Sequence, residues 1–118
     1  QRESYRAGTL DGPRTTYWEN GKVAEIVDFV NDLEHGRWIR KWDNGSLRTK
    51  GGYTNGLLEG ECVYYDESAK MIAKGSYHKS KKHGVWYYFE DNKVTSKETY
   101  RYGVLESETT YSDEQTEE

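Results

Sequence analysis

The three histidines are the side chains best suited to hold a metal ion or to exchange protons, but their spacing argues against both roles. His35 and His83 lie 48 residues apart, which is two periods of the 24-residue repeat described below. In a sheet of such repeats this separation corresponds to four strands, or roughly 19 Å at ~4.8 Å per strand. One zinc ion with bonds of ~2.1 Å cannot join side chains so far apart. We therefore expect polar turn residues here, and no metal or cofactor.

No other group of residues indicates catalysis. Cys62 is the only cysteine, so it forms neither an intrachain disulfide nor a CxxC motif, and we expect a small buried strand residue. Carboxylates such as Glu59 and Glu61 flank a glycine in an expected exposed turn, whereas acid–base chemistry needs a carboxyl group in a special environment. The sequence also lacks a phosphate-binding glycine loop. We predict that the chain is not an enzyme.

One loop concentrates positive charge, and it is a weak candidate for binding an anion. It contains His78, Lys79, Lys81 and Lys82. Nucleic-acid binders usually show a basic face and a high pI, whereas this chain has a net charge of −4 and a pI of about 5.5. Near an anionic membrane each lysine contributes only about 1 kcal/mol. We expect no nucleic-acid partner, and we place a lipid surface behind a protein partner.

Aromatic side chains give the strongest indication of function. Residues two apart in a strand share a face, so the rings of successive predicted strands gather on one side of a sheet. The predicted protein-binding residues are Trp38, Arg40, Trp42, Tyr64, Trp86 and Tyr88. The other face of the same strands carries Ile39, Val63, Tyr65, Tyr87 and Phe89. Rings on both faces exceed what a one-sided core hides, and an exposed apolar patch commonly marks an interaction site.

A repeat of 24 residues must position these side chains. Glycines recur at Gly12, Gly36, Gly60 and Gly84, and each opens a unit. A partial unit precedes Gly12, because Tyr5, Gly8 and Gly12 have the spacing of Tyr53, Gly56 and Gly60. Another first strand, Ser107 to Tyr111, follows the last full unit. We therefore predict one repeat domain over residues 1–111 and a solvated acidic tail over residues 112–118.

Each unit is predicted to be a β-hairpin followed by a second turn. Glu19-Asn20-Gly21 and Asp43-Asn44-Gly45 contain the Asn-Gly pair that closes hairpins. We expect looser turns at Glu67-Ser68-Ala69 and Asp91-Asn92-Lys93, which lack it. The second turn has Gly8, Asp32, Gly56, Ser80 and Gly103 at one repeated position, all of them residue types that tolerate a turn.

The second strands of the units are also predicted to have one apolar face and one wet face. An aromatic ring recurs at Tyr5, Phe29, Tyr53, Tyr77 and Tyr100, and we expect these rings to stack along the sheet. Gly51 and Gly75 should leave room for a neighbouring ring. With one proline and no sustained helical spacing, the chain is predicted to be all-β: an elongated, single antiparallel sheet of stacked 24-residue hairpins.

The repeat unit resembles the MORN repeat variant over about residues 5–111. The resemblance rests on Gly36, Trp38, Trp42, Asn44 and Gly45, followed by Gly51, Gly52, Tyr53, Asn55, Gly56 and Gly60. Proteins built wholly of this variant include the YwqK-like group, which is labelled antitoxins. The resemblance implies a twisted sheet of hairpins and a non-enzymatic role in binding protein or lipid. Cys62 and Arg14 replace the first tryptophan of the pattern, which suggests that the end units cap the sheet.

Several binding functions follow from this pattern. The leading hypothesis is a protein-binding module that acts as an antitoxin or immunity protein, and the acidic balance suits a basic toxin. A carbohydrate-binding aromatic platform is the main alternative, since rings also stack on sugars. A lipid-associated MORN scaffold and a passive repeat that docks further repeats are the others. The printed sequence begins at Gln1 rather than Met, which leaves open a removed leader, so neither compartment nor oligomeric state follows.

Overall fold

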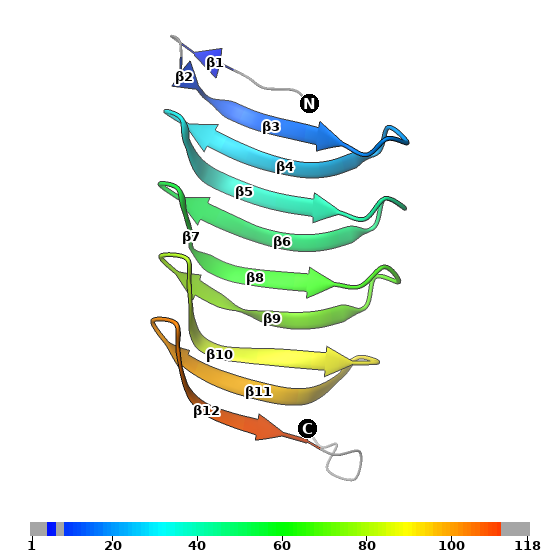
Figure 1. Ribbon diagram of the computed structural model, residues 1–118, viewed down its shortest axis with the longest axis vertical. Coiled ribbons are helices and arrows are strands. Elements are labelled where there is room, and N and C mark those ends of the chain that lie inside the picture. Colours follow the sequence, from blue (N-terminus) through cyan, green and yellow to red (C-terminus); the bar gives the residue numbers. More distant parts are fainter. Residues whose placement is uncertain (1–4, 7–8, 112–118) are drawn as a thin grey trace.

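The computed structural model describes residues 5–6 and 9–111, and these form β-strands joined by short turns (Figure 1). In chain order the strands are β1 Tyr5–Arg6, β2 Thr9–Leu10, β3 Gly12–Tyr17, β4 Val23–Val30, β5 Leu33–Lys41, β6 Leu47–Thr54, β7 Leu57–Leu58, β8 Gly60–Tyr65, β9 Met71–His78, β10 Lys81–Glu90, β11 Lys93–Arg101 and β12 Val104–Thr110. None of the described residues form a helix, so this part of the chain holds no helix able to cross a bilayer.

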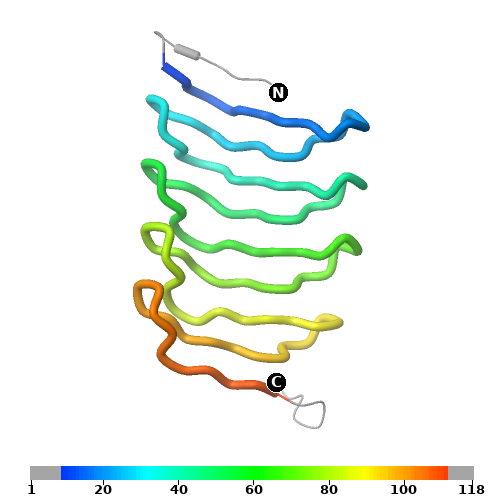
Figure 2. Tube along the Cα trace, viewed as in Figure 1, coloured from blue at the N-terminus to red at the C-terminus, as the bar shows by residue number. Residues whose placement is uncertain are grey.

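Strands β3 to β12 form one antiparallel sheet in which neighbours in sequence are neighbours in space. β7 pairs with the end of β6 just before β8 begins, and β1 pairs only with β2. The strands run across the long axis of the molecule, and the sheet stays open at β3 and β12 (Figures 1 and 2). The prediction of an elongated sheet of consecutive hairpins is confirmed. Gly8 and the acidic segment 112–118 lie outside the described residues.

The first turns, which join the two strands of each hairpin, are more uniform than the sequence predicts. Gly21, Gly45 and Ala69 all have positive φ, at 89°, 92° and 69°. In each case the amide of this residue donates to the carbonyl three residues earlier, at 2.9 to 3.0 Å. The prediction of a looser turn at Ala69 is therefore wrong. The fourth turn is tight as well, because Asp91 and Asn92 both have positive φ, at 52° and 67°, and form a two-residue turn of type I′.

The second turns, which join one hairpin to the next, stack through two sets of hydrogen bonds. The amides of Asp32, Gly56, Ser80 and Gly103 donate to the carbonyls of Leu10, Glu34, Leu58 and Lys82 in the preceding unit. The preceding residue of each turn donates its amide to the side chain at one repeated position, held by Asp11, His35, Glu59 and His83. The expectation of polar turn residues at His35 and His83 is confirmed, and their role is to accept these bonds.

The repeat glycines let each first strand step toward the next unit. Gly12, Gly36, Gly60 and Gly84 all have positive φ, between 85° and 121°. Between the pairs Phe29↔Glu34 and Val27↔Trp38, β5 advances four residues while β4 advances two. This bulge bends the strand, as Figure 1 shows for β5, β8 and β10 near their beginnings. Glycine adopts the required conformation at no steric cost.

The core lies on one face of the sheet, which we call the ring face. Its members include Glu25, Val27, Phe29, Trp38, Arg40, Thr49, Tyr53, Cys62, Tyr64, Ala73, Tyr77, Trp86, Tyr88, Glu98 and Tyr100. Every buried side chain of the described residues belongs to it, including Thr49, Cys62 and Trp86 at 0 to 1% exposure. Cys62 is thus the small buried residue that we predicted.

The opposite face, which we call the lysine face, carries a row of residues in direct cross-strand register. The row consists of Ile26, Ile39, Lys50, Val63, Lys74, Tyr87 and Lys97. Lys50, Lys74 and Lys97 of the second strands therefore lie on the face predicted to be wet. The same face also carries the apolar or aromatic side chains Ile26, Ile39, Val63 and Tyr87, so it is mixed rather than uniformly polar.

The expected stacking of one ring on the equivalent ring of the next unit does not occur among the described residues. The rings of Tyr53 and Tyr77 instead pack edge-on against tryptophans. Tyr53 lies 5.8 Å from Trp38 and Tyr77 lies 5.1 Å from Trp86, between ring centroids. Gly51 and Gly75 provide the space for these two indoles, as predicted: a Cβ at Gly75 would overlap the ring of Trp86.

Candidate functional site

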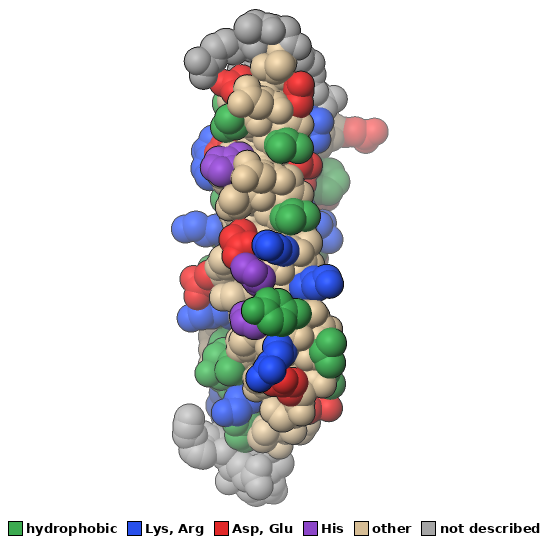
Figure 3. Space-filling view, turned by 90° about the vertical axis from the view of Figure 1, so that its left-hand side faces the viewer, with side chains coloured by type: hydrophobic (Ala, Val, Ile, Leu, Met, Phe, Trp, Pro, Cys, Tyr) green, Lys and Arg blue, Asp and Glu red, His purple; other side chains and the backbone are tan. Residues whose placement is uncertain are grey.

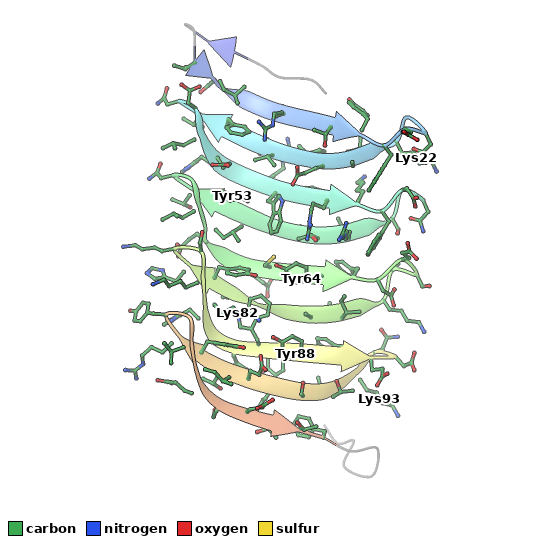
Figure 4. All side chains as sticks on the ribbon, in the orientation of Figure 1. Lys22, Tyr53, Tyr64, Lys82, Tyr88 and Lys93 are labelled. Atoms are coloured by element: carbon green, nitrogen blue, oxygen red, sulfur yellow. The ribbon has the colours of Figure 1, made fainter. Side chains whose placement is uncertain are left out.

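A shallow groove crosses the middle repeats on the ring face, near the ends of the strands that lead to the first turns. Its volume is about 350 Å³. We call it the ring-face groove, and its lining residues are Arg40, Trp42, Arg48, Tyr64, Tyr65, Ile72, Ala73 and Tyr88. They come from β5, β6, β8, β9 and β10 and from the residue after β5. Figure 4 labels Tyr64 and Tyr88, which project from neighbouring repeats of the sheet.

Two β-bulges bring residues into the groove that strand alternation would place elsewhere. Arg40 pairs with Thr49 and Lys41 with Leu47, so Arg48 is the extra residue between them. One repeat later, Ile72 is the extra residue. The sequence prediction missed Arg48 and Ile72 and assigned Tyr65 to the opposite face. The 24-residue spacing of Arg48 and Ile72 was the available signal, but the bulge itself leaves no trace in the sequence pattern.

Cationic side chains cover the tryptophan rings in this part of the sheet. The guanidinium of Arg48 lies 4.3 Å from the ring centre of Trp42, and that of Arg40 lies 5.0 Å from Trp38. Arg40 Nε also donates to Thr49 Oγ1 at 3.2 Å. Within the described part of the chain, no carboxylate oxygen lies within 4 Å of either guanidinium. The charged residues that line the groove are thus both arginines, although the chain as a whole is acidic.

The tyrosines of the groove are held by hydrogen bonds beyond it. The hydroxyl groups of Tyr64 and Tyr77 share a bond of 2.9 Å, and Tyr88 donates to Glu98 Oε1 at 2.8 Å. Burial, followed by the hydrogen bond to Glu98, raises the pKa of Tyr88 to about 12. Burial also raises the pKa of Tyr64. Both phenols stay protonated at neutral pH, so the groove presents fixed neutral rings beside two cations.

Of the six predicted protein-binding residues, the structure brings four together in the groove: Arg40, Trp42, Tyr64 and Tyr88. Trp38 lies on the same face outside the groove lining, where its Nε1 donates to Glu25 Oε2 at 3.0 Å. Trp86 does not fit the predicted role of an exposed anchor, because it is 1% exposed and donates to the Ser76 carbonyl at 2.9 Å. Trp86 is a core residue.

The four residues of the predicted anion-binding loop do not converge on one point. Lys82 lies over the ring face, with its Nζ 4.9 Å from the ring centre of Trp86 and 3.0 Å from the hydroxyl of Tyr88 (Figure 4). His78 is on the edge, where its Nδ1 lies 2.9 Å from Glu59 Oε2. Lys79 donates its amide to the same carboxylate, while its side chain and that of Lys81 are exposed. Because one cation points away and a carboxylate stands beside the others, this loop is a poor anion site.

The edge formed by the second turns gathers two of the histidines. The rings of His78 and His83 lie 5.9 Å apart, and His83 lies 4.7 Å from Tyr102. Figure 3 shows histidine side chains next to one another on this edge, beside a large hydrophobic side chain. Among the described residues no group of three or more His, Cys, Asp or Glu side chains has the geometry to hold a metal ion. Both histidines have structural partners here.

A second depression, of about 410 Å³, lies beside the later first turns. Lys70 Nζ pairs there with Asp91 Oδ1 at 3.1 Å, and Asp66 Oδ1 accepts the amides of Ser68 and Lys70. These polar groups bind one another across two turns. The ring-face groove, whose cations have no carboxylate partner, is therefore the stronger candidate site.

Comparison with known proteins supports the resemblance seen in the repeat pattern. The family model described as the MORN repeat variant matches residues 10–31, which span the end of β2, β3 and β4. The chain thus contains a MORN repeat variant, and the second-turn hydrogen bond of this unit recurs at a 24-residue interval in the next two units and, with its donor one residue earlier, in the fourth. A comparison with curated proteins found no match.

Proposed function

We propose that this chain is a non-enzymatic protein-binding repeat module, and that the ring-face groove is its contact surface. The supporting observation is the groove itself, in which half-buried Trp42, Tyr64, Tyr65 and Tyr88 lie beside two arginines on one face of the sheet. Tyrosine, tryptophan and arginine are the residue types enriched at the centres of protein interfaces. Because hydrogen bonds and packing fix their positions, they lose little conformational freedom on binding.

Within this function we propose the role of an antitoxin or immunity protein that covers and neutralises a toxin. The support is the resemblance of the repeat pattern to a group labelled antitoxins, together with a matching repeat at residues 10–31. A stack of similar hairpins suits this role, since it presents a broad surface to a partner. The test is growth of cells that express the product of each neighbouring gene, with and without this chain. If a neighbouring gene product stops growth and this chain restores it, the antitoxin role is supported. If a neighbouring gene product is toxic and this chain does not restore growth, the role is contradicted.

The arrangement of charges disfavours the carbohydrate alternative. Sugar rings stack on open aromatic faces, whereas Arg48 covers Trp42, Arg40 covers Trp38 and Lys82 covers Trp86. Titration of tryptophan fluorescence with oligosaccharides tests this point. We expect no saturable change.

A pair of matched variants tests whether the groove contacts the partner. Ile72 lines the groove and is 42% exposed, while Val85 is 39% exposed on the opposite face. We expect Ile72→Ser to weaken capture of the partner by about tenfold, because it removes apolar contact at the groove. Val85→Ser makes a similar change elsewhere and should leave capture unaltered. Equal binding by both variants would remove the groove from the proposal.

A further inference from the structure

We propose that the ring-face groove recognises an acidic segment of the partner, in which a carboxylate side chain adjoins an apolar one. This inference deepens the proposed function and depends on it. The carboxylate would lie against Arg40 and Arg48, and the apolar neighbour would pack on Tyr65 and Ile72. All four residues line the one groove.

The first argument concerns the donors that the two arginines still offer. A guanidinium stacked on a ring uses its flat face, and its N–H groups point outward in the plane of its edge. Arg48 stacks on Trp42 and makes no hydrogen bond or ion pair with any residue in the described part of the chain. Arg40 donates only its Nε there, to Thr49. The terminal N–H groups of both side chains are thus available for the paired hydrogen bonds that carboxylates form with arginine.

The second argument concerns the carboxylates of the same face. Glu25 accepts from Trp38 Nε1, and Glu98 accepts from the hydroxyl groups of Tyr88 and Tyr100 at 2.8 and 2.7 Å. Hydrogen bonding to Tyr100 and then Tyr88 lowers the pKa of Glu98. Both carboxylates keep their negative charge, but their oxygens accept from the sheet's own donors, and of the described residues no Asp or Glu lines the groove. The net charge of −4 therefore does not describe the lining of the groove, and the expectation of a basic partner does not follow from it.

The third argument concerns the apolar half of the groove, which favours a polypeptide over a small anion. Ile72 is 42% exposed, and Tyr65, Ala73 and the ring of Trp42 lie beside it. Removing such apolar surface from water favours binding. An inorganic phosphate would satisfy the arginines but would leave this surface exposed. A segment that alternates acidic and apolar side chains satisfies both halves.

Binding of synthetic peptides to the full chain tests the proposal. The probe is a dye-labelled peptide, acetyl-Gly-Asp-Leu-Glu-Phe-Asp-Gly-amide, and its analogue has Asn and Gln in place of Asp and Glu. We expect saturable binding of the acidic peptide, measured by fluorescence anisotropy, that weakens as salt is raised. The amide analogue should bind at least about tenfold more weakly, because charge assistance is lost. Inorganic phosphate at matched ionic strength should not displace the acidic peptide.

Charge-matched variants locate the interaction. The double variant Arg40→Gln/Arg48→Gln should weaken binding by about tenfold or more. Lys50→Gln/Lys74→Gln removes the same charge from the lysine face and should change binding by less than about twofold. Because Arg40 also contacts Trp38 and Thr49, Arg48→Gln alone serves as the variant with an intact fold, checked by its melting temperature.

The outcomes separate this inference from the proposed function. Absence of saturable binding, equal binding of the amide analogue, displacement by phosphate or equal loss in the lysine-face variant would each overturn the acidic preference. If the amide analogue binds with the same affinity as the acidic peptide and Ile72→Ser weakens the binding of both, the groove still binds polypeptide. In that case only the preference for an acidic segment fails. If the natural partner is captured equally well by the Ile72→Ser variant, the proposed contact surface itself fails.

Discussion

The indole of Trp86 lies directly on the backbone of Gly75 in the neighbouring strand. The two residues belong to β10 and β9. The ring of Tyr77 packs against Trp86 at an interplanar angle of 76°, and the Trp86 Nε1 donates to the Ser76 carbonyl. A one-layered sheet buries a tryptophan to 1% exposure in this way. Gly75 is thus required for packing, because its lack of a side chain leaves room for the indole, and it does not form a turn.

Substitution of Gly75 by alanine should strongly destabilise the fold. The added Cβ would overlap the indole, which is 1% exposed and packed against Tyr64, Tyr77 and Lys82, and overpacking of this kind costs about 1–3 kcal/mol. Gly51→Ala is the graded control, because its Cβ would lie 3.0 Å from Cys62 Sγ and 3.2 Å from Trp38 Cε3. Chemical denaturation should show the larger loss for Gly75→Ala. Equal losses would mean that Trp86 does not depend on this contact.

The first turn of the third repeat offers a stabilising change. Ala69 has φ of 69°, a conformation that glycine holds at the equivalent Gly45. Ala69→Gly should raise the free energy of unfolding by about 0.5–1 kcal/mol, since it relieves the left-handed conformation of a residue with a Cβ. Gly45→Ala should lower the free energy of unfolding by a similar amount, because it places a Cβ at a φ of 92°. No steric clash should add to this loss, since the Cβ would meet only Lys22 atoms at 3.7 and 3.8 Å. Thermal melts of the two variants shifting in the same direction would contradict this explanation.

The acceptor at His83 should determine how well the last described second turn is protected. His83 Nδ1 accepts the amide of Tyr102 at 3.1 Å. His83→Ala removes the acceptor and should cost about 0.5–1.5 kcal/mol, with faster hydrogen exchange at the Tyr102 amide. His83→Asp introduces the residue type of the equivalent Asp11 and should retain much of the protection. Exchange that is unchanged in His83→Ala would show that the bond contributes nothing.

The ion pair of Asp28 and Arg37 should make stability depend on acid. Hydrogen bonds from the Arg37 side chain, at 2.9 Å, lower the pKa of Asp28 below its ordinary value of 3.8, against the opposing effect of burial. A lowered pKa in the folded state means that the contribution is complete above about pH 4 and is lost as pH falls through the folded value. Asp28→Asn should therefore flatten the acid side of the stability curve relative to the parent. The side chain of Arg37 is 58% exposed, so the effect should shrink in high salt.

The repeated hairpins and their turns could be predicted from the sequence, whereas the set of residues that lines the groove could not. The 24-residue glycine spacing and the Asn-Gly pairs predict hairpins because each residue type carries its own backbone preference. Bulges arise from the pairing of two strands, so the placement of Arg48 and Ile72 in the groove is invisible in alternation alone. Lys82 belongs to a basic run in the sequence, but its ammonium lies among the rings of Trp86, Tyr88 and Tyr100.

Hydroxyl-radical footprinting of the chain with and without its captured partner tests the central claim most directly, because it reports side chains and so separates the two faces of one sheet. Binding at the ring-face groove predicts that oxidation of Trp42, Tyr65 and Ile72 falls in the complex, while Val85 and Tyr87 on the other face react as before. Protection of Tyr87 with unchanged oxidation of Trp42 would contradict the account.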